Sequence, residues 1–290
     1  MSYATLTFPL GPLAPEAIEQ LCEDSGALSV TFSDASDDPV LEPAPGEIRL
    51  WRNTRVQALF AASTPIAPIR ARLAAALTLP AEAIVAAELG ERIWEREWLR
   101  DFHARRYGTR LWICPRHEQV ADPAAVVVTL DPGLAFGTGH HPSTALCLEW
   151  LDEHLRQGER LIDYGCGSGI LAIAALRLGA SHADCFDIDP QALLATAENA
   201  AANGVEERLR IHPQAATLPR TDLVVANILS GILIDLAPQL AGLVNPGGRL
   251  VVAGLMSLEI HDVTSAYAPW FDMRTAATRE DWACLSGTRC

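Results

Sequence analysis

The chain has 290 residues, of which 49% are hydrophobic and 20% charged, and its formal net charge is −14. This charge argues against broad binding to phosphate backbones, which depends on clustered Lys and Arg, whereas an acidic surface attracts basic proteins. No apolar run approaches the ~18 residues needed to span a bilayer, and the first residues lack the pattern of a secretory signal. We therefore expect a cytoplasmic protein, long enough for two domains, that binds neither nucleic acid nor membranes.

Seven cysteines are scattered along the chain without a Cys-x-x-Cys pair. An odd, dispersed set is typical of reduced thiols in the cytosol and indicates neither a disulfide framework nor a zinc site. No His or Cys cluster has the spacing of metal ligands, so we expect no metal. All 22 basic residues are arginine, which excludes any catalysis by a lysine of this chain.

Residues 1–90 alternate between extended and helical patterns. The predicted strands are 3–8, 27–32, 48–52, 56–61 and 84–89, and the predicted helices are 15–24 and 68–77. This alternation favours a small ferredoxin-like α+β domain. Because it contains none of the glycine loops and acids expected to hold a cofactor, we expect it to recognise a substrate.

Residues 91–110 are predicted to form a linker helix. Trp94, Trp98 and Phe102 recur at spacings of four, which places them on one stripe of a helix. We interpret the stripe as the packing surface of a connector rather than as an aromatic box for a ligand.

Residues 111–290 alternate regularly between strands and helices. The predicted strands are 126–130, 161–164, 183–188, 222–226 and 249–253 with a C-terminal hairpin containing Trp282, and the predicted helices are 142–155, 170–178, 190–203 and 233–243. The pattern predicts an α/β domain with a doubly wound, mostly parallel, seven-stranded sheet. In such a fold the site lies at the carboxyl ends of the strands.

The most informative motif is the strand and turn at 161–170, in which Asp163 precedes three alternate glycines that begin at Gly165. Asp187 ends the next strand, about the ~20 residues beyond the first glycine at which a carboxylate binds ribose hydroxyls. The ligand should therefore be an adenosine-containing cofactor. Ile170 stands where a dinucleotide fingerprint needs its third glycine, which disfavours a nicotinamide oxidoreductase.

A second glycine-rich segment, 130–146, runs from a strand into a helix that opens near Pro142. Three glycines and two prolines exclude a regular element, and the absence of a following Lys-Ser or Lys-Thr excludes a phosphate-binding P-loop. Ser143 and Thr144 can use their hydroxyls on the free backbone groups of the helix start. We interpret the segment as a lid or wall of the cofactor site.

The turn at 163–169 is similar to the cofactor loop of class I methyltransferases that use S-adenosyl-L-methionine, whose sulfonium and ammonium charges suit the Asp163 carboxylate. Together the motifs resemble the bacterial ribosomal protein L-11 methyltransferases, and the resemblance extends over nearly the whole chain. It is carried by Asp131-Pro-Gly-Leu-Ala-Phe-Gly-Thr-Gly-His-His-Pro142, Asp163-Tyr-Gly-Cys-Gly-Ser-Gly-Ile-Leu-Ala-Ile-Ala-Ala175, Val225-Ala-Asn-Ile-Leu229, Ile48-Arg-Leu-Trp51 and Trp94-Glu-Arg-Glu-Trp98.

The resemblance implies a protein methyltransferase whose cofactor contacts are Thr144, Gly165, Asp187 and Asn227. It implies that the substrate is free ribosomal protein L-11, methylated several times on lysine amines and on the α-amine. Asn227 ends an apolar strand and is followed by Ile-Leu rather than by the Pro-Pro-Tyr of many amine methyltransferases. We expect it to be the catalytic residue that handles the acceptor, since methyl transfer to an amine demands mainly positioning.

Two other functions stay open from the sequence. One is a lysine or glutamine methyltransferase that acts on another protein, and the other is a non-catalytic sensor of an adenosine cofactor. The set of Asp163, Asp187 and Asn227 speaks against the sensor. His140 and His141 could relay the proton of the amine, as could solvent.

Overall fold

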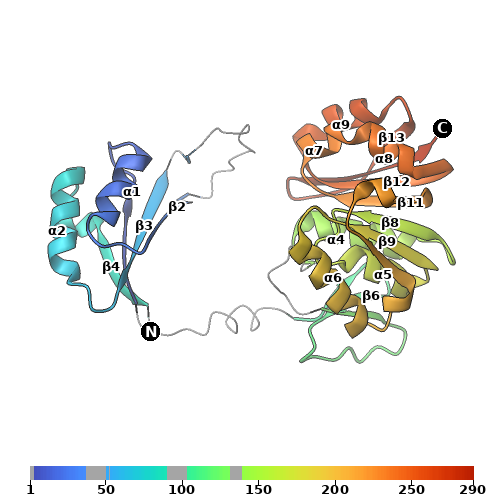
Figure 1. The fold of residues 1–290 in the computed structure, drawn as a ribbon, viewed down its shortest axis with the longest axis horizontal. Helices are drawn as coiled ribbons and strands as arrows, with labels where there is room; N and C mark the ends of the chain where they lie inside the picture. The colour runs from blue at the N-terminus through green and yellow to red at the C-terminus, as the bar shows by residue number, and fades with distance from the viewer. Residues whose placement is uncertain (1–2, 37–49, 52, 90–102, 131–138) are drawn as a thin grey trace. The chain divides into compact units, whose positions relative to one another are not determined.

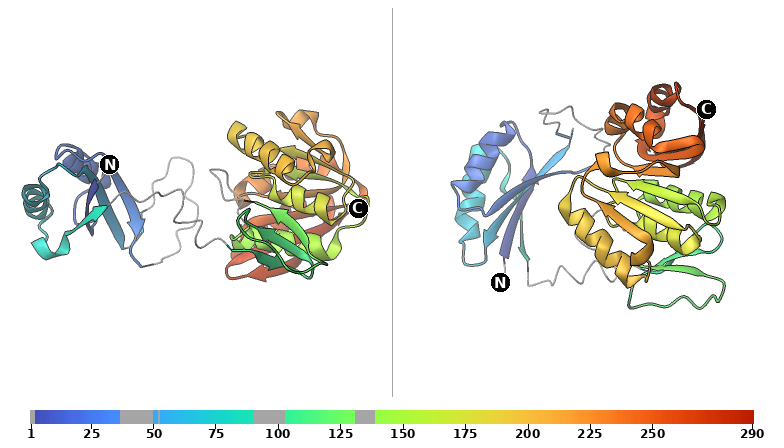
Figure 2. Two further views of the ribbon diagram at one scale, coloured as in Figure 1. Left: turned by 90° about the horizontal axis from the view of Figure 1, so that it is seen from below. Right: turned by 45° about the vertical axis from the view of Figure 1, so that its right-hand side comes forward.

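The computed structural model describes residues 3–36, 50–51, 53–89, 103–130 and 139–290. The chain divides into two compact units, residues 1–97 and 98–290 (Figures 1 and 2). This division falls inside the segment that was predicted to link the two domains. Each unit is described by itself.

The N-terminal unit is an antiparallel four-stranded sheet with two helices, in the β-α-β-β-α-β order of a ferredoxin-like domain. Its elements are β1 (Tyr3–Pro9), α1 (Pro15–Glu23), β2 (Ser29–Asp34), β3 (Thr54–Ala61), α2 (Ile66–Leu77) and β4 (Val85–Leu89), with strand order β2-β3-β1-β4. Burial alternates along β3, and its inward residues Val56, Ala58 and Phe60 are fully buried. This period of two gives the sheet one face for the helices to cover.

The strand predicted at 48–52 and the linker helix predicted at 91–110 lie mostly outside the described residues. Most of the expected strand at 48–52 lies outside the described residues, and the two that are described, Leu50 and Trp51, form no strand. The aromatic stripe of the linker helix also lies outside the described residues. The end of that helix was wrong, because Arg105–Tyr107 forms strand β5 instead.

Strand β5 belongs to a small sheet that precedes the main one. It pairs antiparallel with β6 (Leu111–Cys114), which pairs parallel with β7 (Val126–Thr129). Tyr107 is buried, and its hydroxyl donates to the carbonyl of Gly139 at 2.9 Å. The hairpin with β6 and the long-range bond of Tyr107 to Gly139 thus hold Arg105–Tyr107 extended, against the local helical pattern.

The main sheet has seven strands in the order β10-β9-β8-β11-β12-β14-β13. The strands are β8 (Arg160–Tyr164), β9 (His182–Phe186), β10 (Leu209–His212), β11 (Thr221–Asn227), β12 (Val244–Met256), β13 (Phe271–Arg279) and β14 (Trp282–Arg289). All neighbouring pairs from β10 to β12 are parallel, and β14 is antiparallel to both of its neighbours. The predicted doubly wound, mostly parallel, seven-stranded sheet is confirmed.

Helices cover both faces of this sheet. One face packs against α4 (Pro142–His154), α5 (Ile170–Leu178) and α6 (Pro190–Ala202), and the other against α7 (Ser230–Asp235), α8 (Ala237–Leu243) and α9 (Ile260–Tyr267). The single helix predicted at 233–243 was wrong, because α7 ends before Leu236 and α8 begins after it. Pro238 lies in the first turn of α8, where its missing N–H costs nothing, whereas inside one long helix it would break a hydrogen bond.

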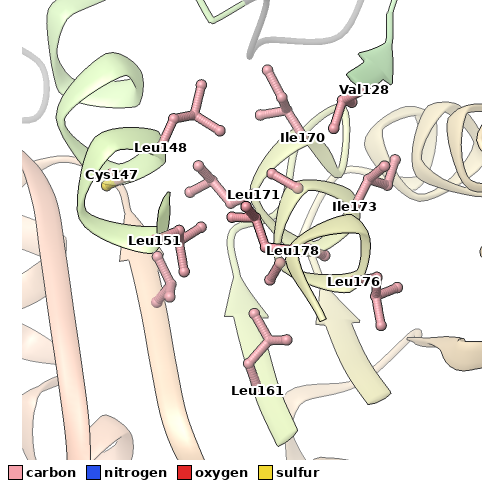
Figure 3. Close-up of a cluster of buried hydrophobic side chains, with 14 of the residues drawn as sticks. Val128, Cys147, Leu148, Leu151, Leu161, Ile170, Leu171, Ile173, Leu176 and Leu178 are labelled. Atoms are coloured by element: carbon pink, nitrogen blue, oxygen red, sulfur yellow. The ribbon is translucent and has the colours of Figure 1, made fainter. Parts of the chain in front are cut away.

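The core beneath α4 and α5 fixes the elements that carry the site. Leu148 and Leu151 of α4 lie beside Leu171 and Leu178 of α5, and Leu161 of β8 lies beneath them (Figure 3). All of these side chains are nearly or fully buried. Burial of a Leu side chain contributes roughly 1.5–3 kcal/mol, so this contact holds α4 and α5 against each other and against β8.

Candidate active site

The four residues predicted to contact the cofactor are all described, and three of them lie at the carboxyl ends of adjacent strands. Gly165 follows β8, Asp187 follows β9, and Asn227 is the last residue of β11. Thr144 lies in the first turn of α4. Strands β9, β8 and β11 are neighbours in the parallel sheet, so these positions share one edge. Most of the second glycine-rich segment, 131–138, lies outside the described residues.

The turn after β8 requires glycine. Gly165 has φ +76°, and a Cβ at this position would overlap the side chain of Ile228. The backbone N–H groups of Gly165 and Cys166 both donate to the carbonyl of Phe186 at the end of β9, at 2.8 and 3.0 Å. The turn is therefore fixed against the neighbouring strand in a conformation that glycine adopts without strain.

Asp187 is held against this turn. Its Oδ2 accepts from the N–H of Gly167 at 2.9 Å, and its Oδ1 accepts from the N–H of Asp189 at the same distance. Asp189 caps α6 by accepting from the N–H of Gln191. The two acids thus have different tasks: Asp189 starts a helix, and Asp187 presents a carboxylate beside the glycine turn.

Thr144 and Asn227 meet although they are 83 residues apart. The Nδ2 of Asn227 donates to the Oγ1 of Thr144 at 3.0 Å. Thr144 is buried and Asn227 partly buried. The hydrogen bond fixes which way the amide of Asn227 is turned, because its donor side is committed to Thr144.

Asp163, at the end of β8, is a buried carboxylate with one unpartnered oxygen. Its Oδ2 accepts from the N–H of Ala172 at 3.0 Å, while its Oδ1 is buried without a hydrogen-bond partner. Burial, the largest cause, raises the pKa of Asp163 from 3.8 to about 7; the Ala172 bond opposes the rise and the Asp187 carboxylate adds to it. A nearby cation would stabilise the ionised form.

His141, near the end of the second segment, has a structural role. His141 is the N-cap of α4, and its Nδ1 accepts from the N–H of Ser143. The expected cap by the Ser143 or Thr144 hydroxyl was therefore wrong, since His141 takes that position and Thr144 bonds to Asn227 instead. Burial is the main cause that lowers the pKa of both His140 and His141. His141 is therefore neutral at pH 7, which suits an acceptor.

Two polar residues that support the turn were missed in the sequence. The hydroxyl of Thr196 donates to the carbonyl of Gly167 at 3.0 Å, and the Nδ2 of Asn199 donates to the carbonyl of Ser168 at 2.9 Å. Both lie on α6, three residues apart. That spacing places them on the same side of a helix, so it was the signal that could have identified them.

The residues at this edge suit S-adenosyl-L-methionine. The turn after β8 is closely packed, because a Cβ on Gly165 would overlap Ile228 and one on Gly169 would overlap Thr196. Asp187 lies beside this turn, where its carboxylate could accept from ribose hydroxyls. The unpartnered oxygen of Asp163 is suited to the positive charge of the methionine part. Within the described residues, no group of three or more His, Cys, Asp or Glu side chains could hold a metal ion.

Comparison with known proteins identifies the family. The sequence matches the family described as ribosomal protein L11 methyltransferase (PrmA) over residues 2–290. The chain belongs to this family. It is 50% identical over 278 residues to the ribosomal protein L11 methyltransferase of Hahella chejuensis, with 94% of each chain covered. It is also 50% identical over 276 residues to that of Actinobacillus succinogenes, again with 94% of each covered.

A solved structure agrees with this assignment. The ribosomal protein L11 methylase of Lactobacillus delbrueckii subsp. bulgaricus is 34% identical, with a TM-score of 0.60. The match covers 65% of this chain and 99% of that one. The protein is thus an L11 methyltransferase by family, with the class I methyltransferase fold and S-adenosyl-L-methionine as its cofactor.

Binding of S-adenosyl-L-methionine to this methyltransferase is expected to weaken as the pH falls through about 7, the raised pKa of Asp163. The cationic cofactor favours the ionised carboxylate, so binding should release a proton. The stability of the folded protein changes in the opposite direction. Because the pKa of Asp163 is higher in the folded than in the unfolded state, the free energy of unfolding falls as the pH rises from about 4 to about 7 and is constant above pH 7.

Calorimetry at about pH 6 and about pH 8 checks this expectation, with Asp163→Asn as the control that cannot ionise. The affinity of the Asn variant should be nearly independent of pH. If it retains the same pH dependence as the wild type, a group other than Asp163 is responsible.

Proposed function

We propose that this protein methylates lysine side-chain amines and the N-terminal α-amine of free ribosomal protein L11, several times per site. Asn227 is the catalytic residue that holds the acceptor amine. Thr144, Gly165, Asp187 and Asn227 hold S-adenosyl-L-methionine. The observation that carries the proposal is the convergence of Asn227, Thr144 and the glycine turn at one edge of the sheet.

Methyl transfer to an amine depends mainly on the correct positioning of the amine and the methyl group. When bound, S-adenosyl-L-methionine supplies a methyl group on a cationic sulfur that is open to in-line attack by an amine. The amide of Asn227 donates to Thr144, and its carbonyl Oδ1 is the atom that can accept an N–H of the substrate amine. Such a bond turns the amine so that its lone pair faces the methyl group, and correct orientation supplies a large part of the rate.

The acceptor amine must lose its proton before it can react. A lysine has a reference pKa of ~10.4, and an apolar site beside a cation lowers it. Leu229 and Ile228 provide apolar surface directly after Asn227, and no strong general base is needed. The neutral His141 is committed to capping α4, so the proton passes to solvent.

The net charge favours one class of substrate. A net charge of −14 favours a basic protein partner over nucleic acid, and ribosomal proteins are generally basic. Within the described residues, no helix is both long enough and apolar enough to cross a bilayer. We infer a cytoplasmic enzyme that acts on the free ribosomal protein and not on membranes or RNA.

We assign substrate recognition to the first unit, residues 1–97, since all the residues that we place around the cofactor belong to the second. Recognition by one unit and catalysis by another would let several amines of one substrate reach the same methyl group. The expected division is 1–90 for recognition, 91–110 for the link and 111–290 for catalysis, with β5 added to the catalytic side.

A truncated chain of residues 98–290 is therefore expected to bind S-adenosyl-L-methionine with nearly full-length affinity and to fail to methylate L11. It keeps β5, whose Tyr107 is buried in the catalytic unit. Circular dichroism verifies folding, calorimetry measures cofactor binding, and mass spectrometry measures methylation. If the folded truncation modifies intact L11 at the full-length rate and sites, the N-terminal unit only stabilises its neighbour.

A further inference from the structure

The segment after Asn227 has little local support of its own. Asn227 ends β11, and Ile228 and Leu229 lead directly into α7, which has only six residues. The N-cap of α7, Leu229, makes no side-chain capping bond. A helix this short is not stable by itself. The orientation of Asn227 therefore depends on the contacts that fix the residues following it, in addition to its pairing with Ala253 and its own bond to Thr144.

One such contact is a close approach of two backbones. The N–H of Ile228 donates to the carbonyl of Ala253 on β12 at 3.2 Å. The next residue of β12, Gly254, has φ +85°, and a Cβ there would overlap the carbonyl of Ile228. This contact fixes the segment against β12 immediately after Asn227.

The second contact is made by Glu259, just beyond the end of β12. Its Oε1 accepts from the hydroxyl of Ser230 at 2.6 Å, and its Oε2 accepts from the N–H of Met256 at 2.7 Å. Ser230 is buried and Glu259 is partly buried. Short, charge-assisted hydrogen bonds of this kind are stronger than neutral ones. Glu259 thus ties the chain three residues after Asn227 to the end of the neighbouring strand.

We propose that Glu259 is a positioning residue for methyl transfer. By holding Ser230 and Met256 together, it fixes the segment from Asn227 to Ser230 in the orientation in which Asn227 holds the acceptor amine. The inference rests on the proposed function of Asn227. It adds a residue that touches neither cofactor nor substrate and acts through the position of the strand end.

Helix α7 is held by a second side chain, Tyr267, which offers a matched comparison with Glu259. The hydroxyl of Tyr267 on α9 donates to the carbonyl of Leu233 on α7 at 2.8 Å, and Tyr267 is fully buried. Glu259 and Tyr267 therefore both tie α7 to the rest of the fold, Glu259 at its first residue and Tyr267 further along. If the hydrogen bonds of Glu259 contribute only to stability, loss of the Glu259 bonds and loss of the Tyr267 bond should have similar effects on turnover.

The test measures kcat at saturating cofactor, the cofactor Kd and the Tm of the full-length protein. Glu259→Ala should lower kcat about tenfold with the cofactor Kd unchanged within about twofold, because orientation matters most in the transition state. Glu259→Gln should restore most of kcat, since its amide can accept from Met256 and donate to the Ser230 hydroxyl. Tyr267→Phe should lower Tm and leave kcat near the wild-type value.

A double-mutant cycle completes the test. In the Asn227→Ala background, Glu259→Ala should cause no further loss of kcat, because Glu259 acts through Asn227. Equal losses in both backgrounds, or a loss in Tyr267→Phe as large as that in Glu259→Ala, would overturn the inference. Wild-type turnover in Asn227→Ala would instead overturn the proposed function itself. Ser230→Ala, which removes only one of the two bonds, replaces Glu259→Ala if that variant does not fold.

Discussion

Asn227→Ala is expected to lower the turnover of methyl transfer by about 10²-fold, the scale of loss that follows from a reacting group misplaced by about 1 Å. The amide that is removed bonds to Thr144 and, in the proposed mechanism, holds the acceptor amine. Saturation with S-adenosyl-L-methionine should not restore the rate, because the missing interaction matters most in the transition state. Steady-state kinetics at several cofactor concentrations makes the measurement.

Asn245→Ala is the matched control for this substitution. Asn245 lies near the start of β12 and bonds to Asp222 in an exposed position, far along the strand from the carboxyl edge. Its loss should leave turnover unchanged. If Asn227→Ala recovers fully at high cofactor concentration, Asn227 contacts the cofactor only and takes no part in holding the amine.

Asp187→Ala is expected to weaken the binding of S-adenosyl-L-methionine at least tenfold. Two hydrogen bonds from ribose hydroxyls to a carboxylate are each worth ~1.5–3 kcal/mol, and ~1.4 kcal/mol corresponds to a factor of ten. The substitution also removes the acceptor for the N–H of Gly167, so the glycine turn loses a support. Calorimetry on the folded variant gives the dissociation constant.

Asp189→Ala is the control that separates a specific role of Asp187 from the effect of removing one negative charge. Asp189 lies two residues away and caps α6. Its loss should cost ~1 kcal/mol of stability, as is usual for a helix cap, with little change in cofactor affinity. Equal weakening by the two substitutions would show that net charge, rather than a ribose contact, determines binding, and unchanged affinity in Asp187→Ala would place the ribose elsewhere.

The parts of the fold that could be predicted are those that depend on local sequence patterns. The strand, glycine turn and helix around Gly165 follow from an apolar run, residues that permit positive φ and a helical apolar stripe. The position of Asp187 follows from its spacing along the chain. The strand end at Asn227 was likewise visible in the sequence, because buried parallel strands are short and apolar.

The remainder depends on contacts between distant segments. Strand β5 was predicted as helix, but the hairpin that it forms with β6 is held from outside by β7 and by the bond of Tyr107 to Gly139. The hydrogen bond between Thr144 and Asn227, and the bridge of Glu259 to Ser230, join residues far apart in sequence. The shifted pKa of Asp163 depends on its burial under α5, which is a property of packing and not of composition.

The proposed activity of this chain is the methylation of amines of a basic ribosomal protein. It is tested by incubation of purified L11 with the full-length protein and S-adenosyl-L-methionine, followed by intact-mass and peptide mass spectrometry. We expect whole numbers of added methyl groups on lysine side chains and on the α-amine, and none with Asn227→Ala over the same time. Unmodified L11 in the presence of a folded, cofactor-binding wild-type protein would contradict the claim, as would methyl groups found only on residues without an amine.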